Sequence, residues 1–242
     1  MALWDAHNGR ALPGPADETS FGPTMYSAGF SANSAYLVTA GLTSVDVWQV
    51  RDGTLLATMP PIPTAESPVA ATFSPDGQSV AVASISGFPI EVWNWRSGNA
   101  PRTLGSKNPA VWPMSVMHSP DGSLLLTVTS SGIAQIWNAH TGARIAQLQG
   151  HTAQVNTAAF SPDSQYVVTG SGDRTARIWQ ARSGLQLAVL QGHAGPLLSV
   201  AFSPDGTFVV TGSADGTARL YRCDVCLPAQ SLLHLAASRG SD

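Results

Sequence analysis

The chain has 242 residues, of which 43% are hydrophobic and only 11% charged, and its formal net charge is −3. Its 12 Lys and Arg residues are scattered, so it lacks the basic patch that binding to a nucleic-acid backbone needs. No segment approaches the roughly 18 to 20 apolar residues of a membrane span, and the N-terminus lacks the pattern of a secretory signal. Two cysteines make no disulfide framework, so we expect a cytoplasmic protein. From the scattered basic residues and the lack of an apolar span, we expect it to bind neither nucleic acid nor membrane.

The first 25 residues differ from the rest of the chain. Residues 1–12 predict part of one structural unit, with the end of a third strand at Leu3 and Trp4, a turn at Asn8 and Gly9, and a fourth strand after it. Residues 13–25 are rich in Pro, Gly and small polar residues, which predicts a loop.

From Met25 onward the sequence repeats itself. An aromatic residue or its substitute precedes a Ser-Pro-Asp-Gly-type turn at intervals of 43, 45, 42 and 42 residues, at Phe30, Phe73, His118, Phe160 and Phe202. Pro and Gly preset the backbone of such a turn between two strands. We predict five repeats, over about residues 25–60, 68–105, 113–149, 150–191 and 192–222, because a period of roughly 40 to 45 residues is typical of propeller blades. His118 is expected to be a partly buried structural residue and not a metal ligand.

A second motif supports the same period. A Trp is followed five residues later by a Gly in five places: Trp4 and Gly9, Trp48 and Gly53, Trp93 and Gly98, Trp137 and Gly142, Trp179 and Gly184. Over residues 1–222 these motifs resemble the WD-repeat family of β-propellers. The resemblance implies an all-β WD40 β-propeller of about five four-stranded antiparallel blades, incomplete or open, followed by a short C-terminal helix.

The number of repeats leaves two arrangements open. WD-repeat propellers usually close with about seven blades, and an unclosed array exposes sheet edges and an apolar blade face. Residues 1–12 could supply the outer strand that the fifth repeat lacks and so close a five-bladed ring. Alternatively, the chain is the C-terminal part of a larger propeller and forms an open arc. The sequence favours the arc, because Leu3 and Trp4 look like the end of an inner strand whose partners are absent.

The fourth repeat holds a His, hydroxyl groups and an Asp, which together suggest a hydrolase site. In WD-repeat proteins, however, these positions form a buried hydrogen-bond chain within one blade, which satisfies a carboxylate inside a sheet and fixes the strand register. The resemblance places this structural tetrad at two sites: His151, Thr169 or Ser171, Asp173 and Trp179, then His193, Thr211 or Ser213, Asp215 and Tyr221. The first three repeats lack the chain, so we expect rigidity to increase toward the C-terminus.

The leading functional hypothesis is a non-catalytic protein–protein interaction scaffold without metal or cofactor, whose specificity lies in its loops. Aromatic and charged residues outside the repeat motifs are the candidate partner contacts: Phe88, Trp95, Trp112 and Arg174. For Trp95 and Trp112 the alternative is packing between blades. There are two alternative hypotheses. The chain could be a propeller-based hydrolase, which an open pocket around His151 and Asp173 would favour, or a non-functional gene fragment.

Residues 223–242 depart from the repeat. Cys223 and Cys226 have the spacing of half a zinc site or of a redox pair, but only His234 lies near them as a further ligand, so we expect two buried thiols. The apolar residues that follow fit one short amphipathic helix: Leu232, Leu233, Leu235, Ala236 and Ala237.

This ending carries a second resemblance. The Cys-Asp-Val-Cys motif after an aromatic residue, followed by a Leu- and Ala-rich segment, resembles the C-terminus of bacterial WD-repeat sensor regions attached to STAND-type signalling NTPases. The resemblance implies a sensor or regulatory propeller of a bacterial signalling protein. Its partners would then be other proteins, further blades, or an NTPase or effector module of a longer chain.

Overall fold

The computed structural model describes residues 3–4, 7–12, 25–41, 44–59, 68–84, 90–104, 113–129, 131 and 133–226. This part of the chain is all-β, apart from one short 3-10 helix, η2 (Asp224–Cys226). None of its helices has the length and apolar character needed to cross a bilayer. The helix predicted around residues 232–237 lies outside the described residues. The chain divides into two compact units, residues 1–130 with 137–144, and residues 131–136 with 145–242.

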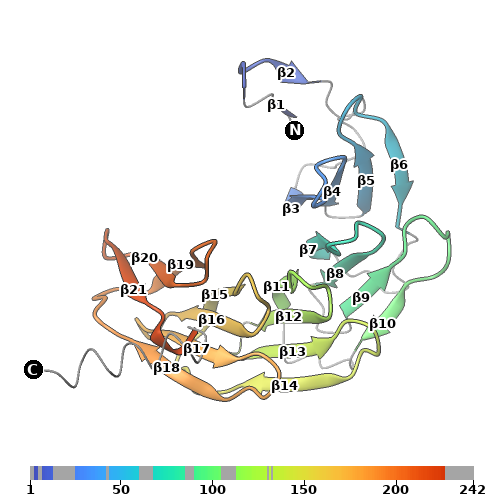
Figure 1. The fold of residues 1–242 in the computed structure, drawn as a ribbon. Coiled ribbons are helices and arrows are strands. Elements are labelled where there is room, and N and C mark those ends of the chain that lie inside the picture. The colour runs from blue at the N-terminus through green and yellow to red at the C-terminus, as the bar shows by residue number, and fades with distance from the viewer. Residues whose placement is uncertain are drawn as a thin grey trace, which may run out of the picture. The chain divides into compact units, whose positions relative to one another are not determined.

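Five antiparallel sheets follow one another along the described chain, one for each sequence repeat, and we call them blades 1 to 5 (Figure 1). Blades 1 to 4 have four strands, blade 5 has three, and strands pair in sequence order in each. This confirms the predicted fold class of four-stranded antiparallel blades, whereas the choice between ring and arc stays a prediction. A separate ribbon pairs β1 (Leu3–Trp4) with β2 (Ala11–Leu12).

The strand bounds follow the repeats closely. Blades 1 and 2 consist of β3 (Met25–Phe30), β4 (Tyr36–Gly41), β5 (Val45–Gln49) and β6 (Leu55–Thr58), then β7 (Pro68–Phe73), β8 (Val80–Ser84), β9 (Ile90–Trp93) and β10 (Arg102–Leu104). Blade 3 consists of β11 (Pro113–His118), β12 (Leu124–Thr129), β13 (Ala134–Asn138) and β14 (Arg144–Leu148). Blades 4 and 5 consist of β15 (Val155–Phe160), β16 (Tyr166–Ser171), β17 (Ala176–Gln180) and β18 (Gln186–Leu190), then β19 (Leu197–Phe202), β20 (Phe208–Ser213) and β21 (Ala218–Arg222).

The second strand is the most buried strand of blades 1 to 4. All residues of β8 and β12 are buried, and in β4 and β16 only the first residue is partly exposed. Such a strand has a neighbour on each edge and side chains packed on both faces, so it favours small and apolar residues. Its buried polar side chains therefore need hydrogen-bond partners inside the sheet, and they include Thr39, Thr127 and Thr169.

Apolar cores join adjacent blades within each compact unit. In the first unit, one core contains Val38 of blade 1 and Phe73 of blade 2, and another contains Leu104 of blade 2 and Val116 of blade 3. In the second unit, the core between blades 4 and 5 includes Val168, Ile178, Leu197 and Val200. Within each unit, a blade thus covers a face of its sequence neighbour, as repeat architectures require.

A Ser-x-Asp turn joins the first two strands of blades 2 to 5. In blade 2, the Ser74 hydroxyl donates to Asp76 Oδ1 at 2.5 Å, and the Gln78 N–H donates to the same oxygen at 3.0 Å. Gly77 then adopts a left-handed φ of 67°, which glycine does without strain. In blade 4 a serine, Ser164, takes this conformation at φ 63°. The side chain of the Asp therefore fixes the turn even where the glycine is missing.

Candidate functional site

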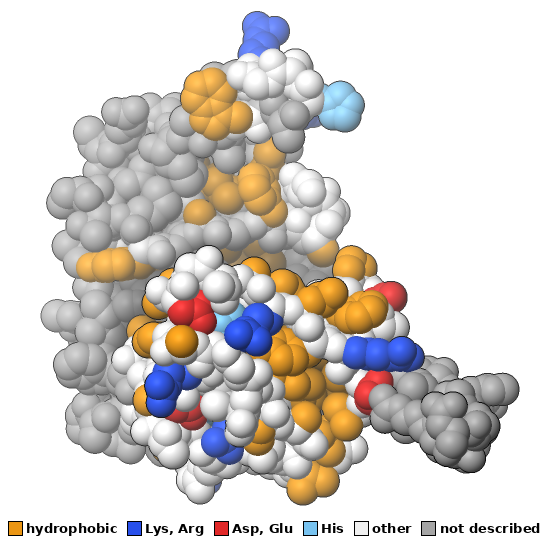
Figure 2. All heavy atoms as spheres, turned by 90° about the vertical axis from the view of Figure 1, so that its left-hand side faces the viewer, with side chains coloured by type: hydrophobic (Ala, Val, Ile, Leu, Met, Phe, Trp, Pro, Cys, Tyr) orange, Lys and Arg blue, Asp and Glu red, His pale blue; other side chains and the backbone are white. Residues whose placement is uncertain are grey.

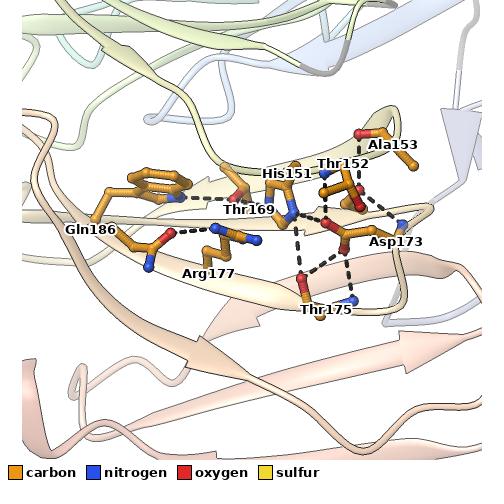
Figure 3. Close-up of polar contacts among 10 residues, drawn as sticks. His151, Thr152, Ala153, Thr169, Asp173, Thr175, Arg177 and Gln186 are labelled. Atoms are coloured by element: carbon orange, nitrogen blue, oxygen red, sulfur yellow. Dashed lines mark hydrogen bonds and ion pairs between the residues drawn. The ribbon is translucent and has the colours of Figure 1, made fainter.

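In blade 4, four residues from four different segments form one hydrogen-bonded chain (Figure 3). His151 comes from the loop before β15, Thr169 from β16, Asp173 from the β16–β17 turn and Trp179 from β17. His151 Nδ1 lies 2.8 Å from Asp173 Oδ2, and His151 Nε2 lies 2.8 Å from Thr169 Oγ1. Trp179 Nε1 donates to the same Thr169 oxygen at 2.8 Å. The structure therefore brings the blade 4 tetrad together through Thr169.

Burial sets the protonation state of His151. Its side chain is 0% exposed, and this burial lowers its pKa from the ordinary value, although Asp173 acts in the opposite direction. A neutral imidazole has one donor nitrogen and one acceptor nitrogen. Nδ1–H therefore donates to Asp173, and Nε2 accepts the hydroxyl proton of Thr169. The Thr169 oxygen is left to accept from Trp179, so each polar group of the chain has a partner.

Asp173 is almost as buried as His151, with 6% of its side chain exposed. Burial alone would raise the pKa of Asp173, but hydrogen bonds from Thr175, His151 and the Thr152 backbone outweigh it and lower that pKa to about 2. The Thr175 hydroxyl donates at 2.7 Å and the Thr152 N–H at 3.1 Å. Sequence reasoning missed Thr175, although the Asp-x-Thr pattern that marks it recurs 42 residues later.

Ser171, the alternative hydroxyl of blade 4, has a different role. Its hydroxyl donates to the backbone carbonyl of Ala153 at 3.1 Å and accepts the N–H of Asp173 at 3.1 Å. Ser171 thus ties the loop before β15 to the β16–β17 turn, and it positions Asp173 without contacting His151.

Blade 5 repeats three of the four positions. His193 Nδ1 lies 2.9 Å from Asp215 Oδ2, and His193 Nε2 lies 2.8 Å from Thr211 Oγ1. Ser213 again donates to backbone carbonyls of the loop before β19. The Tyr221 hydroxyl instead donates to a backbone carbonyl between β18 and β19, at 2.9 Å. Tyr221 therefore takes the strand position of the Trp without joining the chain to Thr211.

Blades 1 and 3 keep one half of the tetrad. Trp48 Nε1 donates to Thr39 Oγ1 at 2.9 Å, and Trp137 Nε1 donates to Thr127 Oγ1 at 3.0 Å. The expectation that the early repeats lack the chain therefore needs correction for these two blades. The Trp–Thr half depends only on two strand positions, so it persists where the loop residues differ.

Blade 2 lacks even this half. Val80 pairs with Trp93 as Val167 pairs with Trp179, so Val82 occupies the position that Thr169 holds in blade 4. Valine offers no acceptor, and the buried Trp93 Nε1 has no hydrogen-bond partner among the described residues. In the described part of blade 2, this indole N–H thus lacks the hydrogen bond that the Trp of blades 1, 3 and 4 makes.

The blade 4 cluster does not present a nucleophile to a substrate. Thr169 and Ser171 are 0% exposed, and both are held by the hydrogen bonds described above. A catalytic hydroxyl must reach the reacting carbon, with oxyanion donors beside it. A hydrolase would need His151 and Asp173 to be accessible from a pocket, but their side chains are only 0% and 6% exposed. Its arrangement instead fixes strand register and the adjoining turn.

The four candidate partner-contact residues differ in exposure and in whether the structure describes them. Trp95 is only 9% exposed, because it packs in the core between blades 1 and 2, stacks edge-on against Tyr36 and donates to the Gly77 carbonyl at 3.0 Å. This burial supports the alternative of packing between blades for Trp95 and not a contact with a partner. Arg174 is exposed in the β16–β17 turn, with φ at 69°. The remaining two candidates, Phe88 and Trp112, lie outside the described residues.

Cys223 and Cys226 form a disulfide, which corrects the expectation of two free thiols. The 3-10 turn η2 has about three residues per turn, so it places both cysteines on one side. Their Cα atoms lie 5.2 Å apart, within the usual range for a disulfide. Cys223 is 1% exposed and belongs to the core between blades 4 and 5. In the described part of the chain, no three or more His, Cys, Asp or Glu side chains lie together in a way that could hold a metal ion.

Comparison with known families identifies the repeats. A family model described as WD domain, G-beta repeat, matches residues 142–180 and 184–222. These two segments are similar to the WD repeat that the model describes. Each match begins at the fourth strand of one blade and ends with the third strand of the next, so the sequence repeat is offset by one strand from the blade. Together with the antiparallel sheets, the match supports a WD40 β-propeller-like fold, and WD40 repeats typically serve as protein-interaction scaffolds. A comparison with curated proteins finds no match.

Proposed function

We propose that this chain is a non-catalytic protein–protein interaction scaffold. The observation that carries this proposal is an apolar sheet face on blade 5 that no described residue covers. The same face of blade 4 is covered by blade 5. Repeat units bury such a face against a neighbour, so an uncovered one is a surface for a partner.

The two blades can be compared position by position, because Val168 pairs with Ile178 in blade 4 as Val210 pairs with Leu220 in blade 5. Val168 is 0% exposed and Ile178 1%, since Leu197 and its neighbours in β19 pack against them. Val210, by contrast, is 42% exposed and Leu220 66%. Because both members of the pair are exposed, the exposure belongs to the sheet face and not to a single side chain.

Two further residues extend this face. Leu198 is 62% exposed where blade 4 has a polar residue, Asn156, and Phe208 is 38% exposed at the start of β20. In the view of Figure 2, hydrophobic side chains gather over this part of the molecule among polar ones. We call Leu198, Phe208, Val210 and Leu220 the blade 5 face. Burying large apolar side chains of this kind stabilises a complex by roughly 25 cal/mol per Å² of area removed from water, before the costs of association.

The proposal has a second, finer part. The tail motif around Cys223 and Cys226 suggests that the chain is a sensor or regulatory propeller segment of a bacterial signalling protein. Its partner would then be a protein, further blades, or an NTPase or effector module in a longer chain. Blotting denatured cell extract with an antibody against the tail tests this part, because a band at the mass of the 242-residue chain alone contradicts it. The cytoplasmic location expected from the sequence stays a prediction.

The first part is tested by quantitative partner capture with the tagged 242-residue chain. Leu198→Asp and Leu220→Asp place charges on the blade 5 face, and Leu185→Asp is the matched control because it alters a 58% exposed leucine in the β17–β18 turn. We expect proteins captured by the unaltered chain and by the control to be lost from both face variants. Exposed substitutions change stability by only about 0.5 kcal/mol, which thermal unfolding checks. Equal capture by all four chains would contradict the proposal.

A further inference from the structure

Blade 5 ends at its third strand. The other four blades add a fourth strand to the outer edge of the third, whereas no described residue pairs with the outer edge of β21. Arg222 corresponds to Gln180 of blade 4, whose N–H donates to the Leu185 carbonyl on the side of β18 at 2.8 Å. Because the bonding side alternates from residue to residue along an antiparallel strand, Ala218 and Leu220 face outward together with Arg222. The edge of β21 thus presents backbone donors and acceptors that no described residue binds.

The sequence of β21 does not oppose the addition of a strand. Exposed sheet edges are usually blunted by proline, by a bulge or by charged side chains. β21 has no proline, and it pairs with β20 in unbroken register. Its Arg219 occupies the position of Arg177 in blade 4, where a fourth strand does pair. Its Arg222 is held by Asp224 at 3.1 Å, on its own chain. Strand addition is therefore compatible with both charges.

Blade 4 shows which side chain accompanies the fourth strand. There, Arg177 donates to the side chain of Gln186, at the start of β18 (Figure 3). Both arginines lie against a glycine backbone: an added Cβ at Gly150 would lie 2.5 Å from Arg177 Nη1. The equivalent distance for Gly192 and Arg219 is 2.7 Å. Arg219, however, is exposed and forms no hydrogen bond or ion pair with a described residue. Its guanidinium thus lacks the acceptor that a fourth strand supplies in blade 4.

Charge decides which segment fits this edge. β21 contains two arginines and no acidic residue. A glutamate in the place of Gln186 would therefore form a charge-assisted hydrogen bond with Arg219, roughly twice as strong as a neutral one. A second copy of the chain fits less well. Two β21 strands paired around Leu220 would make Arg219 of each a diagonal neighbour of the other, and like charges across a strand pair repel.

We propose that the edge of β21 is a docking site for an extended segment of a partner protein, which adds as a fourth antiparallel strand and places a glutamate against Arg219. Its backbone bonds to β21 as β18 bonds to β17, and an apolar residue lies opposite Leu220 as Ala188 lies opposite Ile178. The inference rests on the proposed scaffold function, because it names the kind of segment that a partner presents. It uses the edge of the sheet, however, and not the blade 5 face.

The test uses the 242-residue chain and a fluorescent, end-capped peptide copied from the fourth strand of blade 4. The peptide has the sequence of residues 183–191 with glutamate in place of Gln186. One twin has lysine at that position. A second twin keeps the glutamate but carries N-methyl groups at the positions of Ala188 and Leu190, which pair with the outward-facing residues of β17. Binding is followed by anisotropy, and sedimentation velocity gives the oligomeric state of the chain with and without peptide.

Arg219→Glu reverses the charge that the peptide meets. The matched control is Arg144→Glu, the same change at an exposed arginine in β14, which already is the fourth strand of blade 3. Thermal unfolding checks that both variants keep their stability, as exposed positions usually do. Leu198→Asp separates this site from the proposed function, because β19 lies at the opposite edge of the sheet from β21. If partner capture depends on Leu198 but no peptide binds, the edge site is wrong and the scaffold proposal stands.

We expect the glutamate peptide to bind about fivefold more tightly than the lysine twin, and Arg219→Glu to reverse this preference. Arg144→Glu should change it by less than about twofold, because its charge lies away from the edge. The N-methylated twin should not bind measurably, since it cannot pair with β21. Full binding by that twin would overturn strand addition. An unchanged preference in Arg219→Glu, or an equal loss in Arg144→Glu, would overturn the role of Arg219. A dimer that the peptide dissociates would show that a second copy fills the edge and overturn the partner segment.

Discussion

Blades 4 and 2 have the same sheet topology but differ in what their central strands bury. In blade 4, the Thr169 hydroxyl donates to His151 Nε2 and accepts from Trp179 Nε1, and the tetrad leaves no member unpaired. In blade 2, Val82 stands at that position and the indole N–H of Trp93 finds no hydrogen-bond partner among the described residues. Yet β8 is as buried as β16. The contrast teaches that apolar packing forms the blade, whereas the polar chain adds stability and fixes the loop and turn around it.

The largest effect on this difference between the blades is expected from Thr169→Val, which gives blade 4 the valine that blade 2 has at the same position. Valine has the shape of threonine but no hydroxyl, so His151 Nε2 and Trp179 Nε1 both lose their partner. At roughly 2 kcal/mol for each unsatisfied buried group, we expect the free energy of unfolding to fall by about 4 kcal/mol in a urea titration.

The matched control for this change is Thr211→Val in blade 5, where Thr211 binds His193 but Tyr221 bonds elsewhere. Only one partner is lost there, so we expect about half the effect. Equal losses in the two variants would show that the second hydrogen bond of Thr169 contributes nothing.

The next prediction concerns blade 3, where His118 replaces the phenylalanine of the other repeats. The folded-state pKa of His118 is lowered to about 4, below its ordinary value of 6.5. The unfolded chain therefore binds a proton that the folded chain does not, and stability present above pH 6.5 is lost as pH falls toward 4. At about 1.4 kcal/mol per pKa unit, this loss is at most about 3 kcal/mol.

His118→Phe removes this acid-sensitive contribution. Measured between pH 7 and pH 4, the free energy of unfolding should fall less steeply in the variant than in the unaltered chain. His151, whose pKa is also lowered, contributes to the slope in both proteins and cancels in the comparison. Parallel curves would contradict the assignment of a buried neutral ring to His118.

The sequence was sufficient to predict the blades, because the period of the Phe and Trp motifs follows from strands and turns of fixed length. It also indicated which residues of blade 4 meet, once the resemblance supplied the pairing. It could not decide between Thr169 and Ser171, because they lie two residues apart on the same face of β16, and only the position of the His151 ring distinguishes them. It left Trp95 open between a partner contact and a blade interface, because the partners of this side chain, such as Tyr36, come from another repeat.

The smallest expected effect comes from repairing blade 2. Val82→Thr places a hydroxyl at the position from which Thr169 accepts in blade 4, so it should pair with Trp93 Nε1. A net gain of about 1 kcal/mol is expected from one intramolecular hydrogen bond, measured as a rise in the free energy of unfolding. In a Trp93→Phe background the same change should destabilise, because the buried hydroxyl then has no indole to accept from. The double-mutant cycle isolates this interaction from any effect of valine on packing. A gain that persists without the indole would mean that the hydroxyl finds another partner, and that the tetrad position in blade 2 is not equivalent to that in blade 4.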